Sequence, residues 1–232
     1  MPPDGPSIRA MFDRIARRYS LVNTLTSFGL DRHWRREAVQ LAAARPADRL
    51  LDVCCGPGDL ADAFAEADPH PDEIVATDFS ARMIAAAQAR QAARVTPITL
   101  LQADATALPW PDATFDIVSC GFGLRNVCDP TAALREFLRV LRPGGRVVIL
   151  EFGLPSQWAL RAIFRVYFHL VLPAIGGLVS GDFRAYRYLP RSVERFFSAR
   201  QVADMVQAAG FADVHQRLLT HGVAAVTVGT RS

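Results

Sequence analysis

From residue 50 onward, short apolar runs alternate with stretches of helical periodicity, and this alternation constrains the fold more than any other feature of the sequence. Short apolar runs that end at turn residues or acids predict buried strands. The predicted strands cover residues 50–55, 73–77, 98–102, 115–120 and 146–152. The predicted helices between them cover residues 59–66, 81–93 and 131–141. Strands that alternate with helices form parallel βαβ units, so helices should cover both faces of the sheet.

The C-terminal end of the sequence follows a different pattern. A helix is predicted over 199–209, followed by strands at 214–219 and 224–229 that are joined by a short turn at His221 and Gly222. Two strands joined by so short a turn form an antiparallel hairpin. We therefore expect an α/β sandwich of three layers whose seven-stranded sheet is mostly parallel, with an antiparallel strand supplied by the C-terminus.

Two segments lie outside this pattern, residues 8–45 and residues 153–197. The first carries two helical patterns ahead of the first strand, and the second is too long for a plain crossover between strands. Open α/β sheets bind ligands at the carboxyl ends of their strands, and we expect both segments to form a helical cap over that edge. A length of 232 residues fits a single domain with such a cap, which we expect to span 1–232.

Composition and charge exclude several classes of function. All 26 basic residues are arginine, which excludes chemistry that needs a lysine Schiff base or a phosphate-loop lysine. The net charge of +3 is too balanced for the clustered basic face of a nucleic-acid-binding protein. The four cysteines and five histidines lack chelating spacing, so no metal site is expected. Residues 1–8 have no apolar signal core, and we expect a cytoplasmic protein.

Residues 56–61 follow a predicted strand and open a predicted helix, and they fit the G-x-G-x-x-G/A pattern of cofactor-binding turns. Gly56 and Gly58 let the backbone approach a cofactor closely, and Asp78 stands where an acid would bind a ribose diol. These features alone leave a nicotinamide-dependent dehydrogenase open. The pyrophosphate of its cofactor would sit at the helix N-terminus, however, where Asp59 places a negative charge.

Charge favours S-adenosylmethionine as the cofactor. It has no phosphate, and its ammonium and sulfonium groups suit Asp52 and Asp59, which flank the turn. Asp104, at the end of the third predicted strand, is placed to accept a hydrogen bond from an adenine amino group, with the amide of Ala105 nearby. A glycine turn can also serve only tight packing, and strand-end acids are frequently helix caps. Three such acids in register with the turn, Asp52, Asp78 and Asp104, favour the cofactor site.

Several stretches resemble known methyltransferases. Residues 52–58 occupy the place of the motif Asp-x-Gly-x-Gly-x-Gly, and residues 103–116 and 141–146 are similar to general signatures of class I methyltransferases. The stretches that resemble the UbiE/MenG family more specifically are 12–19, 121–127 and 186–190. That family comprises the quinol C-methyltransferases of menaquinone and ubiquinone synthesis. The resemblance implies the Rossmann-like class I methyltransferase fold, with S-adenosylmethionine as cofactor.

The resemblance also implies a reaction, which is C-methylation of demethylmenaquinol to menaquinol, with a polyprenyl naphthoquinol as substrate. Cys54 and Cys55 in the turn are more similar to menaquinone-type members, so benzoquinol methylation on the ubiquinone route stays the alternative. Pro57 and Gly121 depart from the Thr and Ser common in the family, and both changes lose a hydroxyl while keeping the backbone. By position, the resemblance implies cofactor contacts from Pro57, Asp78, Asp104, Ala105 and Gly121.

Methylation of a ring carbon requires an electron-rich hydroquinol, and loss of a phenolic proton raises the nucleophilicity of the adjacent carbon. Arg125 is the candidate for stabilising the phenolate, because a guanidinium stays cationic and offers fixed donors. Asn126 could orient a hydroxyl, and Tyr19 could bind the ring or relay a proton. Tyr186 or Tyr188 from the cap could also bind the ring or relay a proton, and His33 and His169 are the candidates for the base.

Residues 158–179 are mostly apolar and long enough to suggest a membrane span. Arg161, Arg165 and His169 interrupt the stretch at i, i+4 and i+8 spacing, which places them on one stripe of a helix. Each central arginine would cost about 2.5–3.5 kcal/mol in a membrane, so the pattern predicts an amphipathic helix that Pro173 ends. Its apolar face can pack toward the core as a lid helix. The same face can form a surface for a polyprenyl tail, with peripheral contact to the inner face of the cell membrane. The two interpretations are compatible, and both stay open.

Overall fold

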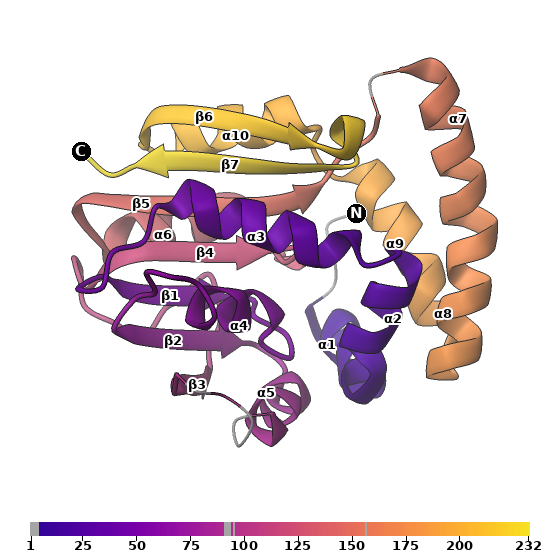
Figure 1. Ribbon diagram of the computed structural model, residues 1–232, viewed down its shortest axis with the longest axis horizontal. Helices are drawn as coiled ribbons and strands as arrows, with labels where there is room; N and C mark the ends of the chain where they lie inside the picture. The colour runs from indigo at the N-terminus through magenta and orange to yellow at the C-terminus, as the bar shows by residue number, and fades with distance from the viewer. Residues whose placement is uncertain (1–4, 91–93, 95, 156) are drawn as a thin grey trace.

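Seven strands form one sheet through the centre of the molecule (Figure 1). The structure is a computed structural model that describes residues 5–90, 94, 96–155 and 157–232. The strands are β1 (Arg49–Val53), β2 (Glu73–Asp78), β3 (Ile98–Gln102), β4 (Phe115–Gly121), β5 (Leu141–Phe152), β6 (Ala212–Leu219) and β7 (Ala224–Thr230). Their order is β3-β2-β1-β4-β5-β7-β6, with antiparallel pairing only where β7 meets β5 and β6. This arrangement confirms the predicted sheet and its C-terminal hairpin.

β5 begins at Leu141, whereas the sequence predicted a strand from Arg146. Leu141 pairs with Phe115 at the start of β4, and an irregularity in the register follows. Gly144, with a left-handed φ of 77°, lies in this stretch and donates its N–H to the carbonyl oxygen of Arg231 at 2.7 Å. The sequence Pro143-Gly144-Gly145 is therefore accommodated inside the strand.

Apolar helix faces cover both sides of the sheet. The helices that do so are α3 (Leu30–Ala42), α4 (Asp59–Ala65), α6 (Pro130–Val140) and α10 (Ala199–Ala208). α6 and α10 pack on one face, and α3 and α4 pack on the other. The position of α3 corrects the expectation that residues 8–45 lie wholly over the carboxyl edge. Its buried residues Trp34, Ala38 and Ala42 instead join the core beside β5 and β7.

α5 (Ala81–Ala89) follows β2 and completes the βαβ pattern. Ser80 caps it as predicted, because its hydroxyl oxygen accepts the N–H of Met83 at 3.1 Å. The sequence predicted this helix as far as residue 93, and residues 91–93 lie outside the described part of the chain.

The cap lies at the end of the sheet to which the parallel strands point (Figure 1). Its helices are α1 (Gly5–Ile15), α2 (Tyr19–Thr26), α7 (Trp158–Val166), α8 (Leu172–Ser180) and α9 (Phe183–Arg195). They pack around an apolar cluster of their own that includes Met11, Val22, Phe168 and Tyr186. Both segments outside the strand–helix alternation contribute helices to the cap, although α3 leaves it for the sheet.

α7 and α8 form one continuous helix, Trp158–Ser180, across a π-helical turn at Tyr167–Val171. This corrects the expectation that Pro173 ends the helix. Proline lacks the N–H of a helical hydrogen bond, and the wider turn before it accommodates that loss, so Pro173 stands in the first turn of α8. By length and composition alone, this is the one helix in the described ranges that is long and apolar enough to cross a membrane.

Candidate active site

The predicted glycine turn joins β1 to α4 at the carboxyl edge of the sheet. Cys54 (φ 58°), Gly56 (φ 56°) and Gly58 (φ 90°) all adopt left-handed backbone conformations, which let the chain reverse sharply between strand and helix. Such a conformation is uncommon for a residue with a side chain such as Cys54. Cys55 anchors the turn by donating its N–H to the carbonyl oxygen of Thr77 on β2 at 2.8 Å.

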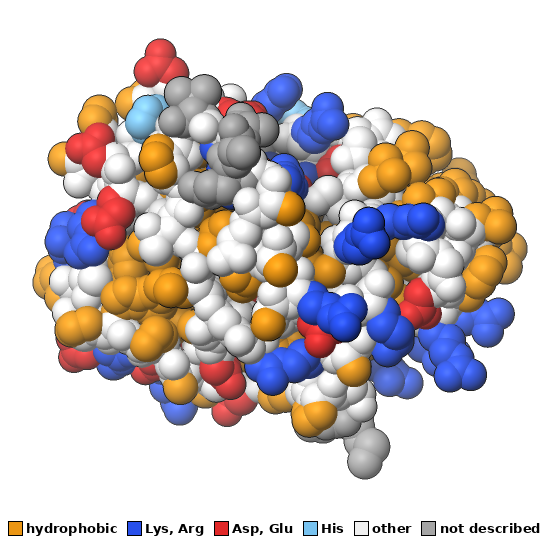
Figure 2. All heavy atoms as spheres, turned by 90° about the horizontal axis from the view of Figure 1, so that it is seen from below, with side chains coloured by type: hydrophobic (Ala, Val, Ile, Leu, Met, Phe, Trp, Pro, Cys, Tyr) orange, Lys and Arg blue, Asp and Glu red, His pale blue; other side chains and the backbone are white. Residues whose placement is uncertain are grey.

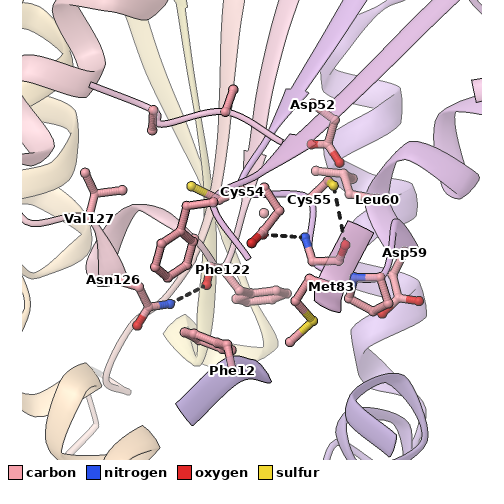
Figure 3. Close-up of a pocket in the computed structure, with 18 of the residues that line it drawn as sticks. Phe12, Asp52, Cys54, Cys55, Asp59, Leu60, Met83, Phe122, Asn126 and Val127 are labelled. Carbon is pink, nitrogen blue, oxygen red and sulfur yellow. Dashed lines mark hydrogen bonds between the residues drawn. The ribbon is translucent and has the colours of Figure 1, made fainter. Parts of the chain in front are cut away.

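A cavity of about 150 Å³, which we call the turn cavity, lies beside this turn and reaches α1 (Figure 3). Its wall brings together the expected cofactor residues Asp52, Gly56, Pro57, Asp78, Asp104, Ala105 and Gly121. Gly58 is not among them and faces α5, where a Cβ atom would lie 2.8 Å from Arg94 Nη2. The sequence did not single out the apolar residues that complete the wall, which include Phe12, Leu60, Met83 and Phe122.

Asp78 is held in place by the backbone around it. Its Oδ2 accepts the N–H of Gly56 at 2.9 Å, and its Oδ1 accepts the N–H of Ser80 at 2.9 Å. Burial raises the pKa of Asp78 to about 6 in spite of these hydrogen bonds. Since a carboxylate oxygen can accept more than one hydrogen bond, both oxygens keep capacity for further donors such as ribose hydroxyls.

Asp52, at the end of β1, has one oxygen in use and one free. Its Oδ1 accepts a hydrogen bond from the hydroxyl of Ser119 on β4 at 2.7 Å. Its Oδ2 is buried and has no hydrogen-bond partner in the described part of the chain. Burial raises the pKa of Asp52 to about 7. An unpartnered carboxylate oxygen in the cavity wall is a natural acceptor for a cationic group of a ligand.

Asp59 is engaged by the protein itself. Its Oδ1 accepts hydrogen bonds from Arg90 at 2.5 Å and from the hydroxyl of Ser20 at 2.9 Å. Its Oδ2 lies 3.4 Å from Nη2 of Arg35. These contacts correct the expectation that Asp59 offers a free negative charge to a cofactor cation. Because two arginines compensate its charge, Asp59 instead joins α4 to α2, α3 and α5, and Asp52 is the acid left for the cation.

Asp104 and Ala105 lie in the loop after β3. Asp104 is exposed, and its Oδ1 accepts hydrogen bonds from both the N–H and the hydroxyl of Thr106 at 2.8 Å. Ala105 beside it is buried. The hydrogen bonds to Thr106 fix the direction of the Asp104 carboxylate at the rim of the turn cavity, where it can accept from a ligand amino group.

A second cavity, of about 260 Å³, lies between the end of the sheet and the cap helices. We call it the cap cavity. Tyr19, Asn23 and Phe122 line both cavities, so the two spaces adjoin. The wall of the cap cavity is largely apolar, with side chains from α1, α7 and the π turn that include Met11, Ile15, Phe164 and Phe168.

Arg125 lies in the 3-10 turn Leu124–Asn126 after β4 and lines the cap cavity. It is 6% exposed, and its Nη1 donates to Glu151 Oε2 at 3.0 Å. The guanidinium also stands 5.2 Å from the ring centre of Phe152. Burial opposes the charge of Arg125, but Glu151 keeps its pKa above the usual value. The group therefore stays cationic at the inner end of an apolar cavity.

The structure brings Asn126 and Tyr19 to the same region but not the histidines. Asn126 lines the turn cavity, and its Oδ1 accepts a hydrogen bond from the hydroxyl of Tyr188 at 3.0 Å. His33 is exposed and lines neither cavity. His169 points away from both cavities, toward Glu194, which lies 3.0 Å from its Nε2. The two histidine candidates therefore stand apart from the site.

Contacts between α1 and the loop after β2 were not predicted. Arg9 donates to the carbonyl oxygen of Phe79 at 2.7 Å, and Asp13 accepts the hydroxyl of Ser80 at 2.5 Å. These contacts fasten the cap to the two residues that follow Asp78. Residues 12–19 resemble the family in sequence. That resemblance did not indicate that Asp13 contacts Ser80, which is far away in the sequence.

Comparisons with known proteins agree with the geometry. A model of the ubiE/COQ5 methyltransferase family matches residues 4–231. A demethylmenaquinone methyltransferase of Thermus thermophilus is 50% identical over 221 residues, which cover 95% of this chain and 100% of that protein. A protein of Syntrophotalea carbinolica named ubiquinone/menaquinone biosynthesis C-methyltransferase UbiE is 45% identical over 228 residues, which cover 98% of this chain and 95% of that protein.

Solved structures of other proteins share the fold of this chain. A SAM-dependent methyltransferase of Thermotoga maritima superimposes with a TM-score of 0.68 at 20% sequence identity. The match covers 97% of this chain and 100% of that one. At this identity the likeness concerns the fold alone, and it confirms the predicted class I methyltransferase architecture.

Proposed function

The chain belongs to the ubiE/COQ5 methyltransferase family, and on that premise we propose that it methylates a ring carbon of demethylmenaquinol, giving menaquinol, with S-adenosylmethionine as the methyl donor. The observation that carries this proposal is the 50% identity to a demethylmenaquinone methyltransferase along the whole length of that protein. Relatives named for both quinone pathways support a second candidate, methylation of a benzoquinol in ubiquinone biosynthesis.

The polar groups around the turn cavity match those of S-adenosylmethionine in chemistry. The unpartnered oxygen of Asp52 would accept a hydrogen bond from the ammonium group, and Asp78 would accept from the ribose hydroxyls. Asp104 and Ala105 would hold the adenine at the rim. When bound, the cofactor supplies a methyl group on a positively charged sulfur. The residues of the turn would fix that group in one position, and alignment of this kind accounts for much of the acceleration in methyl transfer.

The hydroquinol ring would lie in the cap cavity beside Arg125. The guanidinium would stabilise the phenolate that makes the neighbouring ring carbon nucleophilic, and its effect is large because the cavity is apolar and buried. Tyr19, which lines both cavities, would hold the ring against the methyl donor. Asn126, oriented by Tyr188, would bind a ring hydroxyl.

The outer surface of the cap suits a substrate with a polyprenyl tail. No residue of α7 is buried, and Figure 2 shows hydrophobic side chains gathered at the cap end with arginines beside them. The exposed apolar residues of α7, the π turn and α8 include Trp158, Ile163, Val166, Leu170 and Leu178. We propose that this surface contacts the inner face of the cell membrane peripherally, and that the tail enters the cap cavity from there.

The test is methyl transfer by the purified protein from S-adenosylmethionine to two reduced quinones of equal tail length. We expect demethylmenaquinol to be methylated at a higher kcat/KM than the benzoquinol. A strain that lacks the gene should accumulate demethylmenaquinone, which the intact gene should remove. Saturable binding of NAD without any response to S-adenosylmethionine would overturn the proposal.

A further inference from the structure

Two residues that line the cap cavity each carry a buried polar atom without a hydrogen-bond partner in the described part of the chain. Tyr186 on α9 lines this cavity and is 3% exposed, and its hydroxyl is buried without a partner in the ranges that the structure describes. The same is true of Nε of Arg125, which lines the same cavity. Buried polar groups in folded proteins nearly always have partners, because an unpartnered group lowers stability. Two such groups in one apolar cavity indicate a ligand that supplies both partners.

The ring of Tyr186 is held firmly by its neighbours. It packs against Gly176 on α8, where a Cβ atom would lie 2.4 Å from two of its ring carbons. Since only glycine allows this approach, α8 fixes the position of the ring. Burial raises the pKa of Tyr186 well above its usual value. Its hydroxyl therefore stays protonated at neutral pH and is available as a hydrogen-bond donor.

Tyr188, on the same helix, provides the contrast. It also lines the cap cavity, but its hydroxyl donates to Oδ1 of Asn126 at 3.0 Å. The protein itself satisfies Tyr188, whereas it leaves Tyr186 unsatisfied. Both tyrosines lie on α9 and line the cap cavity. They differ only in whether the protein itself provides a hydrogen-bond partner for the hydroxyl.

A hydroquinol substrate would explain why the cap cavity has two separate hydrogen-bond donors, Arg125 and Tyr186. This explanation rests on the proposed function. A hydroquinol carries oxygens on opposite ring carbons, and Arg125 meets the one next to the methyl-accepting carbon, where charge develops. We infer that Tyr186 binds the substrate by donating a hydrogen bond to the other ring oxygen, the one remote from the methyl-accepting carbon. A ring held at both oxygens presents one edge to the methyl donor, so Tyr186 also helps to select the carbon that is methylated.

The experiment compares two substrates in three enzymes. The substrates are the hydroquinol and an analogue without the hydroxyl remote from the methyl-accepting carbon. In the wild type, kcat/KM should be roughly 10-fold lower for the analogue, as expected for one lost hydrogen bond. In Tyr186→Phe, kcat/KM for the hydroquinol should fall by a similar factor, and kcat/KM for the analogue should not change. Tyr188→Phe should keep the wild-type ratio between the two substrates.

Stability and cofactor binding provide separate readouts. The melting temperature of Tyr186→Phe should equal or exceed that of the wild type, because the variant removes an unpartnered buried hydroxyl. Its affinity for S-adenosylmethionine should not change. The inference is overturned if Tyr186→Phe retains the wild-type preference for the hydroquinol. It is also overturned if the wild type uses both substrates equally, a result that needs no variant. Methylation of neither substrate by wild type with bound S-adenosylmethionine would refute the proposed function, and this inference with it.

Discussion

At the residue scale, the wall of the turn cavity contains two buried carboxylates, Asp52 and Asp78. Burial raises their pKa values from 3.8 to about 7 and about 6, respectively. The folded protein therefore binds these protons more tightly than the unfolded chain does. As the pH rises from about 4 to about 7, the free energy of unfolding should fall, because ionisation of the two groups favours the unfolded chain. A bound cation would offset this loss.

The first prediction concerns the pH dependence of cofactor binding. We expect the Kd of S-adenosylmethionine to decrease as the pH rises from about 5.5 to about 7.5, because Asp52 must lose its proton before it can pair with the ammonium group. Isothermal titration calorimetry in buffers of different ionisation enthalpy should detect proton release on binding. Asp52→Asn should bind more weakly and lose most of this pH dependence. A wild-type Kd that is constant over the range would refute the role given to Asp52.

The second prediction concerns Arg125, whose planar group lies between Glu151 and the ring of Phe152. Arg125→Lys keeps the positive charge but loses the fixed donors, including the unpartnered Nε. Single-turnover rates should fall by about 100-fold, as for the loss of a donor to a developing oxyanion. The Kd of S-adenosylmethionine should be unchanged. Normal turnover in the lysine variant would mean that Arg125 serves only as the structural partner of Glu151.

At the scale of helices and strands, local sequence patterns predicted the strands and the acids at their ends, because both depend on neighbours in the chain. The position of α3 was not predictable, since an amphipathic helix has the same period whichever apolar surface receives it. The π turn before Pro173 depends on how the long helix packs in the cap. Asp59 was misjudged because its partners Arg35 and Arg90 are 24 and 31 residues away. The predictions that were wrong concern features that tertiary contacts determine.

The third prediction concerns the helix of α7 and the π turn, which lines the cap cavity with Phe164 and Phe168. Each tail methylene buried there contributes about 0.8 kcal/mol, so serine at both positions should raise KM far more for a long-tailed quinol than for a short-tailed analogue. The affinity for S-adenosylmethionine should be unchanged. Leu25→Ser changes an exposed apolar residue of α2 that lines neither cavity; it is the control and should leave the ratio of the two KM values as in the wild type. Equal losses for both tail lengths would show that the phenylalanines only pack the cap.

At the scale of the whole molecule, the proposed function assigns the cofactor and the quinol to two adjoining cavities. The sheet edge carries the buried carboxylates of the turn cavity, and the cap carries apolar walls and an exposed apolar surface (Figure 2). Tyr19 belongs to the cap and lines both spaces, so neither part forms the site alone. We therefore propose that sheet and cap act as one catalytic unit over residues 1–232.

The last prediction concerns membrane contact through the cap. The exposed apolar residues of α7 and α8 lie near a helix, α9, whose exposed arginines are Arg184, Arg187, Arg191 and Arg195. Apolar contact and attraction to anionic lipid should act together, so the protein should bind anionic vesicles more tightly than neutral ones, and salt should weaken the difference. Trp158 is 83% exposed, and its fluorescence should shift to the blue on binding, a shift that Trp158→Phe should remove.

A carbonate wash should release the protein from membranes, because peripheral contact does not survive it. Retention after the wash would instead mean that the helix Trp158–Ser180 inserts across the bilayer, and an unshifted Trp158 would mean that another surface makes the contact.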